Sequence, residues 1–181
     1  MSTITPLPIE GSWMISSEEF KDSRGVFREW LPNSACKEII GKNLEVAQAN
    51  FSVSKKGTLR GIHYSLVPEG QAKLVTCLTG KIFDVVVDLR PNSQTFGQWH
   101  GIILSAHSPL SIYVGPGLGH AFLALEDNTG VAYLLSSAYN KEVEYGINPF
   151  DKEIGITWPQ LEFLLSDKDA AAPSLKEAKL N

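Results

Sequence analysis

The stretch AKLVTCLTGKIFDVVVDL, residues 72–89, decides the fold class. It contains two runs rich in Val, Ile and Leu, residues 72–79 and 81–89, separated at Thr79-Gly80. Short apolar runs bounded by turn residues are typical of β-strands. The segment between them is far too short for a crossover helix, which counts against a parallel α/β sheet. We therefore predict two strands here within an all-β protein.

The same pattern continues on both sides of this stretch. Strand-like segments occupy residues 45–54, 58–65, 99–104, 110–114, 121–126 and 131–138, with Gly, Pro, Asn and Ser turns between them. Short strands at a spacing of about 8–12 residues predict a sandwich or barrel. Peripheral helices are expected at Ser34–Ile40, ended by Gly41, and in the tail 170–180 from Pro173. We expect one domain over residues 1–181.

Composition limits the classes of function. The 181 residues are 43% hydrophobic and 20% charged, which is typical of a folded globular protein. A net charge of −4 gives no general attraction to nucleic acid, so none is expected as a partner. Cys36 and Cys77 do not require an oxidising compartment. The N-terminus lacks a signal-peptide pattern, and Ile82–Leu89 is too short to span a membrane. A cytoplasmic, membrane-free protein is expected.

Four histidines are present, and two of them have informative surroundings. His100 and His107 read as surface or loop residues. His63 follows Gly57 by six positions and His120 closes a glycine-rich turn, which echoes the metal site of the cupin jelly roll. Ser65 replaces the second histidine of that motif, so a metal would have to bind His63, Glu69 and His120. The cation of Lys73 on the next strand argues against such a site.

The alternative is a pocket without metal that performs acid–base chemistry. His63 is suited to act as the base, and Lys73 can supply the cation that stabilises a developing oxyanion. Tyr133 can act as the acid, although Tyr133 considered alone is typical of a core aromatic residue. Asp84 and Asp88 share one face of their strand, where Asp84 would orient His120 or pair with Lys73. A solvated outer face explains the two acids equally well.

Two arginines are candidates for holding a phosphate. A guanidinium group can bind a phosphate through two parallel hydrogen bonds. Arg24 is in a predicted turn and Arg60 in a predicted strand, and both positions allow such a contact. Arg24 in the Asp22-Ser-Arg-Gly turn reads equally as a solvated residue. Arg60 precedes His63 by three positions, so regular alternation would direct them to opposite faces unless a bulge occurs at Gly61.

Longer motifs resemble a known family. They are FKDSRGVFRE (20–29), QAN (48–50), GTLRGIHY (57–64), GQAKLV (70–75), IFDVVVDLR (82–90), SQTFGQW (93–99), LSA (104–106), GHAF (119–122), GITWP (155–159) and LSDKDAAAP (165–173). Together they cover about residues 15–175 and resemble the dTDP-4-dehydrorhamnose 3,5-epimerase family.

The resemblance implies a cupin-type jelly-roll homodimer that needs neither metal nor organic cofactor and acts on a dTDP-4-keto-6-deoxyhexose. By likeness, His63 is the base, Asp169 holds its imidazole, Lys73 stabilises the enolate oxygen, and Tyr133 returns a proton from the other face. Arg60 would meet the diphosphate together with Arg24, which the partner subunit would donate. Further expected substrate contacts are Gln48, Asn50, Tyr139 on thymine, and Phe20, Phe27, Glu29, His120, Glu144 and Lys168.

One segment departs from the rhamnose-pathway pattern. The turn before His120 reads GPGLGHA, and Leu134 stands where the rhamnose enzymes carry Lys. These features resemble the branch that serves antibiotic deoxysugars, in which one centre alone is inverted in some members. The resemblance therefore implies inversion at C3, at C5 or at both, in rhamnose or antibiotic-sugar biosynthesis.

Overall fold

The computed structural model describes residues 2–30, 33–68 and 70–180. The strands and helices have the following bounds: β1 (Thr3–Pro6), β2 (Ser12–Ser16), β3 (Glu19–Asp22), β4 (Gly25–Arg28), α1 (Asn33–Ile40), β5 (Gln48–Ser54), β6 (Leu59–Ser65), β7 (Lys73–Thr79), β8 (Lys81–Asp88), β9 (Trp99–Ser105), β10 (Leu110–Val114), β11 (Leu118–Ala124), β12 (Thr129–Leu135), β13 (Glu144–Gly146) and α2 (Asp167–Ala170).

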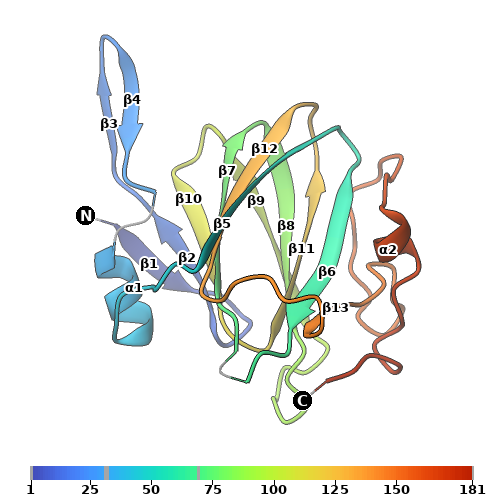
Figure 1. Ribbon diagram of the computed structural model, residues 1–181. Helices are drawn as coiled ribbons and strands as arrows, with labels where there is room; N and C mark the ends of the chain where they lie inside the picture. Colours follow the sequence, from blue (N-terminus) through green and yellow to red (C-terminus); the bar gives the residue numbers. More distant parts are fainter. Residues whose placement is uncertain (1, 31–32, 69, 181) are drawn as a thin grey trace.

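Two antiparallel sheets face each other (Figure 1). One has six strands in the order β1-β2-β10-β7-β12-β5, and the other has five in the order β13-β6-β11-β8-β9. Consecutive strands such as β7 and β8 lie in different sheets, as in a jelly roll. The all-β class and the short peripheral helices are confirmed, but the two sheets are not hydrogen-bonded into a closed barrel among the described residues.

Strand alternation explains how the core divides. On β8, Ile82 and Val86 face the six-stranded sheet and pack with Val75 and Val131 in the space between the sheets. The outer-facing Val85, Val87 and Leu89 pack under the C-terminal segment, where Trp158 and Leu175 cover them. Helix α1 covers the outside of the other sheet through Ala35 and Cys36. Both cysteines are buried and unpaired.

Short elements at both ends differ from the expected ones. The sequence pattern missed β1 to β4 and β13, which are three to five residues long. The prediction of a helix from Pro173 is wrong: α2 ends at Ala170, and residues 171–180 are irregular, with a turn at residues 175–177. The helix begins earlier because the Ser166 hydroxyl accepts from the Asp169 N–H, while Leu175 is drawn into the outer core. Within the described residues no helix is long and apolar enough to cross a membrane.

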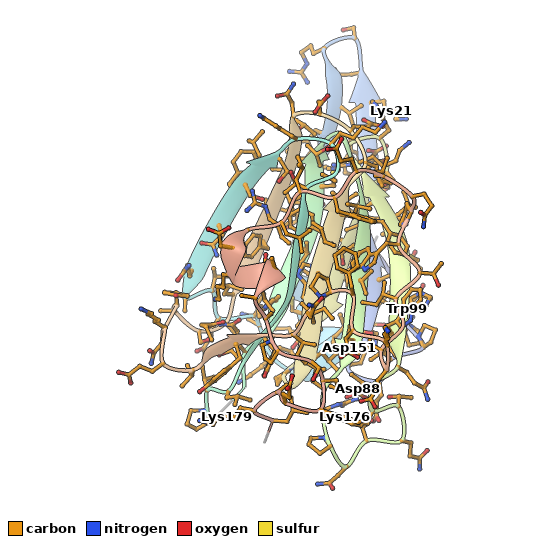
Figure 2. All side chains as sticks on the ribbon, turned by 90° about the vertical axis from the view of Figure 1, so that its right-hand side faces the viewer. Lys21, Asp88, Trp99, Asp151, Lys176 and Lys179 are labelled. Atoms are coloured by element: carbon orange, nitrogen blue, oxygen red, sulfur yellow. The ribbon has the colours of Figure 1, made fainter. Side chains whose placement is uncertain are left out.

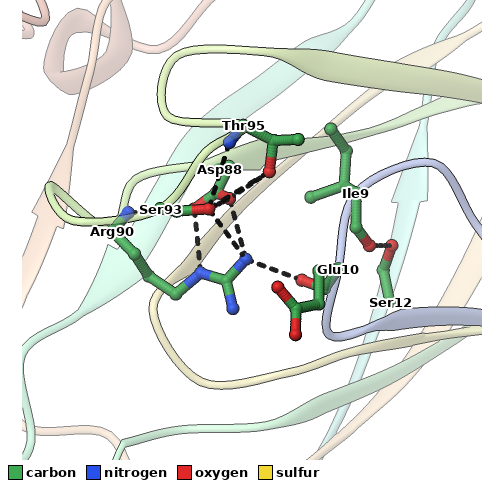
Figure 3. Close-up of polar contacts among 7 residues, drawn as sticks. All are labelled: Ile9, Glu10, Ser12, Asp88, Arg90, Ser93 and Thr95. Carbon is green, nitrogen blue, oxygen red and sulfur yellow. Dashed lines mark hydrogen bonds and ion pairs between the residues drawn. The ribbon is translucent and has the colours of Figure 1, made fainter.

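Asp88 organises the loop after β8 (Figure 3). Its fully buried carboxylate accepts hydrogen bonds from Arg90, from the hydroxyls of Ser93 and Thr95, and from the Arg90 backbone N–H. Burial alone would raise its pKa, but these donors outweigh burial and lower the pKa to about 2. Arg90 also donates to the Glu10 carbonyl and so ties this loop to the N-terminal segment.

The β3–β4 hairpin and the Asp88 cluster mark opposite ends of the molecule. Figure 2 shows Lys21 of the hairpin at one end, and Asp88 with Lys176 at the other. The hairpin projects away from both sheets (Figure 1), and Phe20, Val26 and Phe27 on it are more than half exposed.

Candidate active site

A pocket of about 210 Å³ opens between the sheets. Its walls come from both sheets, from the loop after β12 and from α2. The residues that line it are Gln48, Asn50, His63, Gln71, Lys73, Tyr133, Leu135, Tyr139, Glu144, Tyr145 and Lys168. Eight of them are predicted site residues, so the fold gathers half of the predicted set in one place.

His63 and Asp169 form a dyad at this pocket. His63 Nε2 lies 2.6 Å from Asp169 Oδ1, although 106 positions separate the two residues in sequence. The carboxylate side chain is 7% exposed and the imidazole 38% exposed, so the ring faces the pocket while its partner is enclosed. Burial raises the pKa of Asp169, but the contact with His63 and further hydrogen bonds lower it on balance. The carboxylate is therefore ionised and suited to hold the Nε2–H tautomer.

Lys73 lies at the base of the pocket next to His63. Its ammonium donates to the His63 backbone carbonyl at 3.2 Å, and the residue is 7% exposed. Burial lowers the pKa of Lys73 to about 8, while the charges of Glu144 and Asp84 oppose that decrease. A cation is thus available at neutral pH beside the imidazole.

A β-bulge reconciles Arg60 with His63. In the pairing of β6 with β11, His63 lies opposite His120 and Arg60 opposite Phe122, with a register shift between them. His120 and Phe122 point to the same face, so Arg60 and His63 do too. Gly61 allows this close approach, since a Cβ there would lie 2.6 Å from that of Ala121. The irregularity expected near Gly61 is present, and Arg60 donates to the Ser54 hydroxyl.

His120 and Asp84 form a second buried pair. His120 Nε2 lies 2.8 Å from Asp84 Oδ2, and Asp84 is fully buried between the sheets. The alternative of a solvated outer face for Asp84 is therefore wrong. Glu69, the third ligand of the metal alternative, lies outside the described residues. Among the residues that are described, no three His, Cys, Asp or Glu side chains are grouped to hold a metal ion.

Tyr133 enters the pocket from the six-stranded sheet, opposite to the sheet that carries His63. Beside it, Asn50 accepts a hydrogen bond from Gln48, and the Gln48 side-chain oxygen accepts from the Tyr139 backbone N–H. This chain of contacts places Tyr139, which is 59% exposed, at the rim.

Six predicted substrate contacts are not among the residues that line this pocket: Arg60 and His120, described above, and four residues at or next to the β3–β4 hairpin. Phe20, Arg24 and Phe27 are on the projecting hairpin, and Glu29 follows it. The Arg24 guanidinium contacts Asp22 of the same turn at 2.6 Å. The chain's own pocket is therefore formed without these residues.

Some pocket residues were not predicted. Gln71 and Tyr145 line the pocket beside Lys73 and Glu144. Gln71 was detectable, because it precedes Lys73 by two positions and alternation directs both side chains to the same side. Tyr145 has no such signal, since β13 is only three residues long. As expected, His100 and His107 are not among the pocket residues.

A larger hollow of about 370 Å³ is lined by loop residues 66–68, 70, 89–92 and 116–117. Most described residues that line it are Leu, Val or Pro. Its one phenol, Tyr64, has a pKa raised by burial to about 12 and donates to the Lys179 carbonyl. None of its described lining residues is a histidine or a carboxylate, so we assign the chemistry to the smaller pocket.

Comparison with known sequences identifies relatives over almost the whole chain. The model of the family described as dTDP-4-dehydrorhamnose 3,5-epimerase matches residues 6–177. The dTDP-4-dehydrorhamnose 3,5-epimerase of Mycolicibacterium smegmatis is 48% identical over 98% of this chain and 88% of its own length. The dTDP-4-dehydrorhamnose 3-epimerase of Streptomyces niveus is 47% identical over 97% of this chain and 85% of its own.

Solved structures agree with the sequence relatives. A 4-keto-6-deoxy sugar epimerase from the novobiocin biosynthetic gene cluster of Streptomyces spheroides superposes with a TM-score of 0.95 and 46% identity, over 98% of this chain and 89% of that one. A 3'-monoepimerase from Streptomyces bikiniensis, in complex with dTDP-quinovose, gives a TM-score of 0.91 and 44% identity. The match covers 94% of this chain and 87% of that one.

Proposed function

This chain belongs to the dTDP-4-dehydrorhamnose 3,5-epimerase family, and on that premise we propose that its pocket inverts one or both carbon centres beside the C4 ketone of a dTDP-4-keto-6-deoxyhexose. The observation that carries the proposal is the arrangement of three groups. His63, held by Asp169 of α2, lines the pocket from one sheet, Tyr133 lines it from the other, and the buried Lys73 ammonium donates to the His63 backbone carbonyl. The product belongs to deoxysugar biosynthesis, for rhamnose or for an antibiotic sugar.

The reaction begins with removal of a proton from C3 or C5. Asp169 accepts the Nε2–H of His63, so the lone pair is on Nδ1, which takes the proton from carbon. The electrons of the broken C–H bond move into the carbonyl, and the oxygen at C4 becomes an enolate. Lys73 stabilises that negative charge, because a buried cation interacts more strongly than a solvated one.

Inversion is completed from the opposite face. The Tyr133 hydroxyl donates a proton to the same carbon as the enolate collapses to the ketone. His63 releases its proton to water and Tyr133 regains one, so the net change is stereochemical. We propose that this needs no metal or organic cofactor, because side chains of the pocket supply the base, the cation and the second proton donor.

The nucleotide part of the substrate would lie toward the rim. Arg60, on the same face as His63, would hold the diphosphate, and Tyr139 would stack on thymine with Gln48 and Asn50 beside it. Glu144, Lys168 and His120 would complete the sugar site. Two buried, unpaired cysteines suit a reducing compartment, and we propose the cytoplasm.

Solvent exchange tests this function directly. With dTDP-4-keto-6-deoxyglucose in heavy water, we expect NMR to show loss of the C3 proton signal, with loss at C5 as well if the enzyme inverts both. C3 is the centre that the 3,5-epimerase and 3-epimerase relatives share by name. A chelator should leave the rate unchanged. Absence of exchange at both carbons would refute the proposed function, and loss of activity on chelation would favour the metal alternative.

We further propose that the active form is a homodimer in which the β3–β4 hairpin reaches the other subunit. Phe27 is 69% exposed at the projecting hairpin, and Phe51 and Val53 leave an apolar strip on the outside of β5. Within the described part of the chain, the hydrogen bonds and the ion pair of Arg24 are with Asp22 of its own turn. In the dimer, Phe20, Arg24, Phe27 and Glu29 would serve the partner subunit's pocket.

Mixed dimers test this arrangement. Arg24→Ala should lower kcat/KM by about a hundredfold through loss of a diphosphate contact. Co-expression with an inactive His63→Ala chain should restore roughly a quarter of wild-type activity, because half of the dimers are mixed and each has one intact composite site. If the hairpin serves its own subunit, co-expression gives no recovery above the sum of the two variants.

A further inference from the structure

Gln71 has a buried side-chain amide at the wall of the pocket. It is 5% exposed, and its nitrogen donates to the Ser137 hydroxyl at 2.9 Å and to Glu144 Oε1 at 3.1 Å. None of the proposed chemical steps uses it. A buried amide hydrogen with a carboxylate acceptor forms a charge-assisted hydrogen bond, which is stronger and more directional than a neutral one.

The two acceptors are at opposite ends of one loop. Residues 136–143 connect β12 to β13, with Ser137 at the start and Glu144 just after the end. Next to Gln71, Ala72 exchanges hydrogen bonds with Ser136, through the Ser136 hydroxyl and the Ser136 backbone N–H. Gln71 thus closes the loop and holds the Glu144 carboxylate toward the pocket.

Glu144 acts on the charge of Lys73. Gln71 precedes Lys73 by two positions, and Lys73 and Glu144 both line the pocket. Burial lowers the pKa of Lys73, and the negative charges of Glu144 and Asp84 oppose that decrease. Glu144 has the larger effect of the two. The titratable groups around Lys73 on the packed strands are Asp84 (β8), His63 (β6), His120 (β11), Tyr133 (β12), and Glu144 and Tyr145 (β13). Lys168 and Tyr139 add to the pocket from its rim.

We propose that Gln71 is a positioning residue, which fixes the Glu144 carboxylate where it stabilises the Lys73 cation that the enolate requires. The inference rests on the proposed function, because it assigns Lys73 the oxyanion. Gln71 does not touch the reacting carbon in this scheme, and acts through Glu144.

The sign of the expected effect follows from burial. Lys73 has a pKa lowered from 10.5 to about 8, so activity that needs the cation falls as pH rises through that region. If the Glu144 carboxylate is not held in place, its negative charge offsets less of the effect of burial on the pKa of Lys73. The pKa of Lys73 then decreases further. The alkaline limb of the kcat/KM profile then moves to lower pH.

The test is Gln71→Met, which keeps an unbranched side chain of similar length and removes the donor. We expect the alkaline limb to shift to lower pH by about half a unit. At pH values above the pKa of Lys73, kcat/KM should then be lower than that of the wild type by roughly a further threefold compared with the difference at neutral pH. Ser137→Ala is the matched control, since it removes only the second acceptor of the same amide and should leave the limb in place. Glu144→Gln should shift the limb in the same direction, and the double variant should shift it less than the sum.

The outcomes separate the inference from the function. An unmoved limb in Gln71→Met, with a shifted limb in Glu144→Gln, overturns the positioning role while heavy-water exchange still demonstrates epimerase chemistry. A limb that moves equally in Ser137→Ala overturns it too, because loop closure alone would then be responsible. If Gln71→Met does not fold, Gln71→Asn, whose shorter amide cannot reach Glu144 in the same position, is expected to show the same shift.

Discussion

His63→Ala should abolish deuterium incorporation into the substrate and lower the epimerisation rate by at least about a thousandfold. The imidazole lines the pocket and is held by the Asp169 carboxylate through Nε2, which leaves Nδ1 for the proton on carbon. We expect no other described pocket residue to replace it: Lys73 is a cation near neutral pH, and the other ionisable groups are the amine of Lys168, the carboxylate of Glu144 and three phenols. Proton NMR in heavy water measures exchange at C3 and C5, and product formation measures inversion.

His100→Ala is the control for this experiment. His100 is on β9 of the same five-stranded sheet and does not line the pocket, so its loss should leave exchange at the wild-type rate. Unchanged melting temperatures would show that both variants are folded. Exchange at the wild-type rate in His63→Ala would remove His63 from the role of base, and with it the central element of the proposed mechanism.

Tyr133→Phe should separate exchange from inversion. His63 is intact in this variant, so it still removes a proton and returns deuterium to the same face. Inversion needs a donor on the other face, and without the Tyr133 hydroxyl it should slow by about a hundredfold or more. The expected product is therefore deuterated substrate of unchanged configuration, which is identified by NMR of the recovered sugar nucleotide.

Tyr113→Phe is a matched control for the loss of a phenol. Tyr113 is on β10 of the same six-stranded sheet, but it packs on the outer side with α1. Its substitution should preserve both exchange and inversion. If Tyr133→Phe inverts as fast as it exchanges, another group or water supplies the second proton.

The strands that were predicted correctly share a simple physical property. In β7, β8 and β12, apolar side chains alternate or run continuously because both faces of each strand are covered, so the pattern is visible in the sequence. The hairpin strands β3 and β4 are exposed, and they bury no face within this chain that would produce such a pattern. The incorrect tail helix followed from local propensity, which packing of Leu175 against the outer core overrides.

The sequence alone identified most of the pocket residues. Residue type and position on predicted strands made His63, Lys73 and Tyr133 candidates, whereas Gln48 and Asn50 were expected from the resemblance to the family. The sequence also identified Gly61 as the position where an irregularity was needed.

Tertiary structure decided the rest, because the decisive contacts join residues far apart in the chain. The bulge opposite Ala121 turns Arg60 to the same side as His63, and the packing of α2 brings Asp169 to the imidazole over 106 positions. The contact of Gln71 with both ends of a loop likewise exists only once β7 and β13 are in place. Alternation along one strand can predict which face a side chain takes, whereas a partner from another strand depends on how the sheets pack.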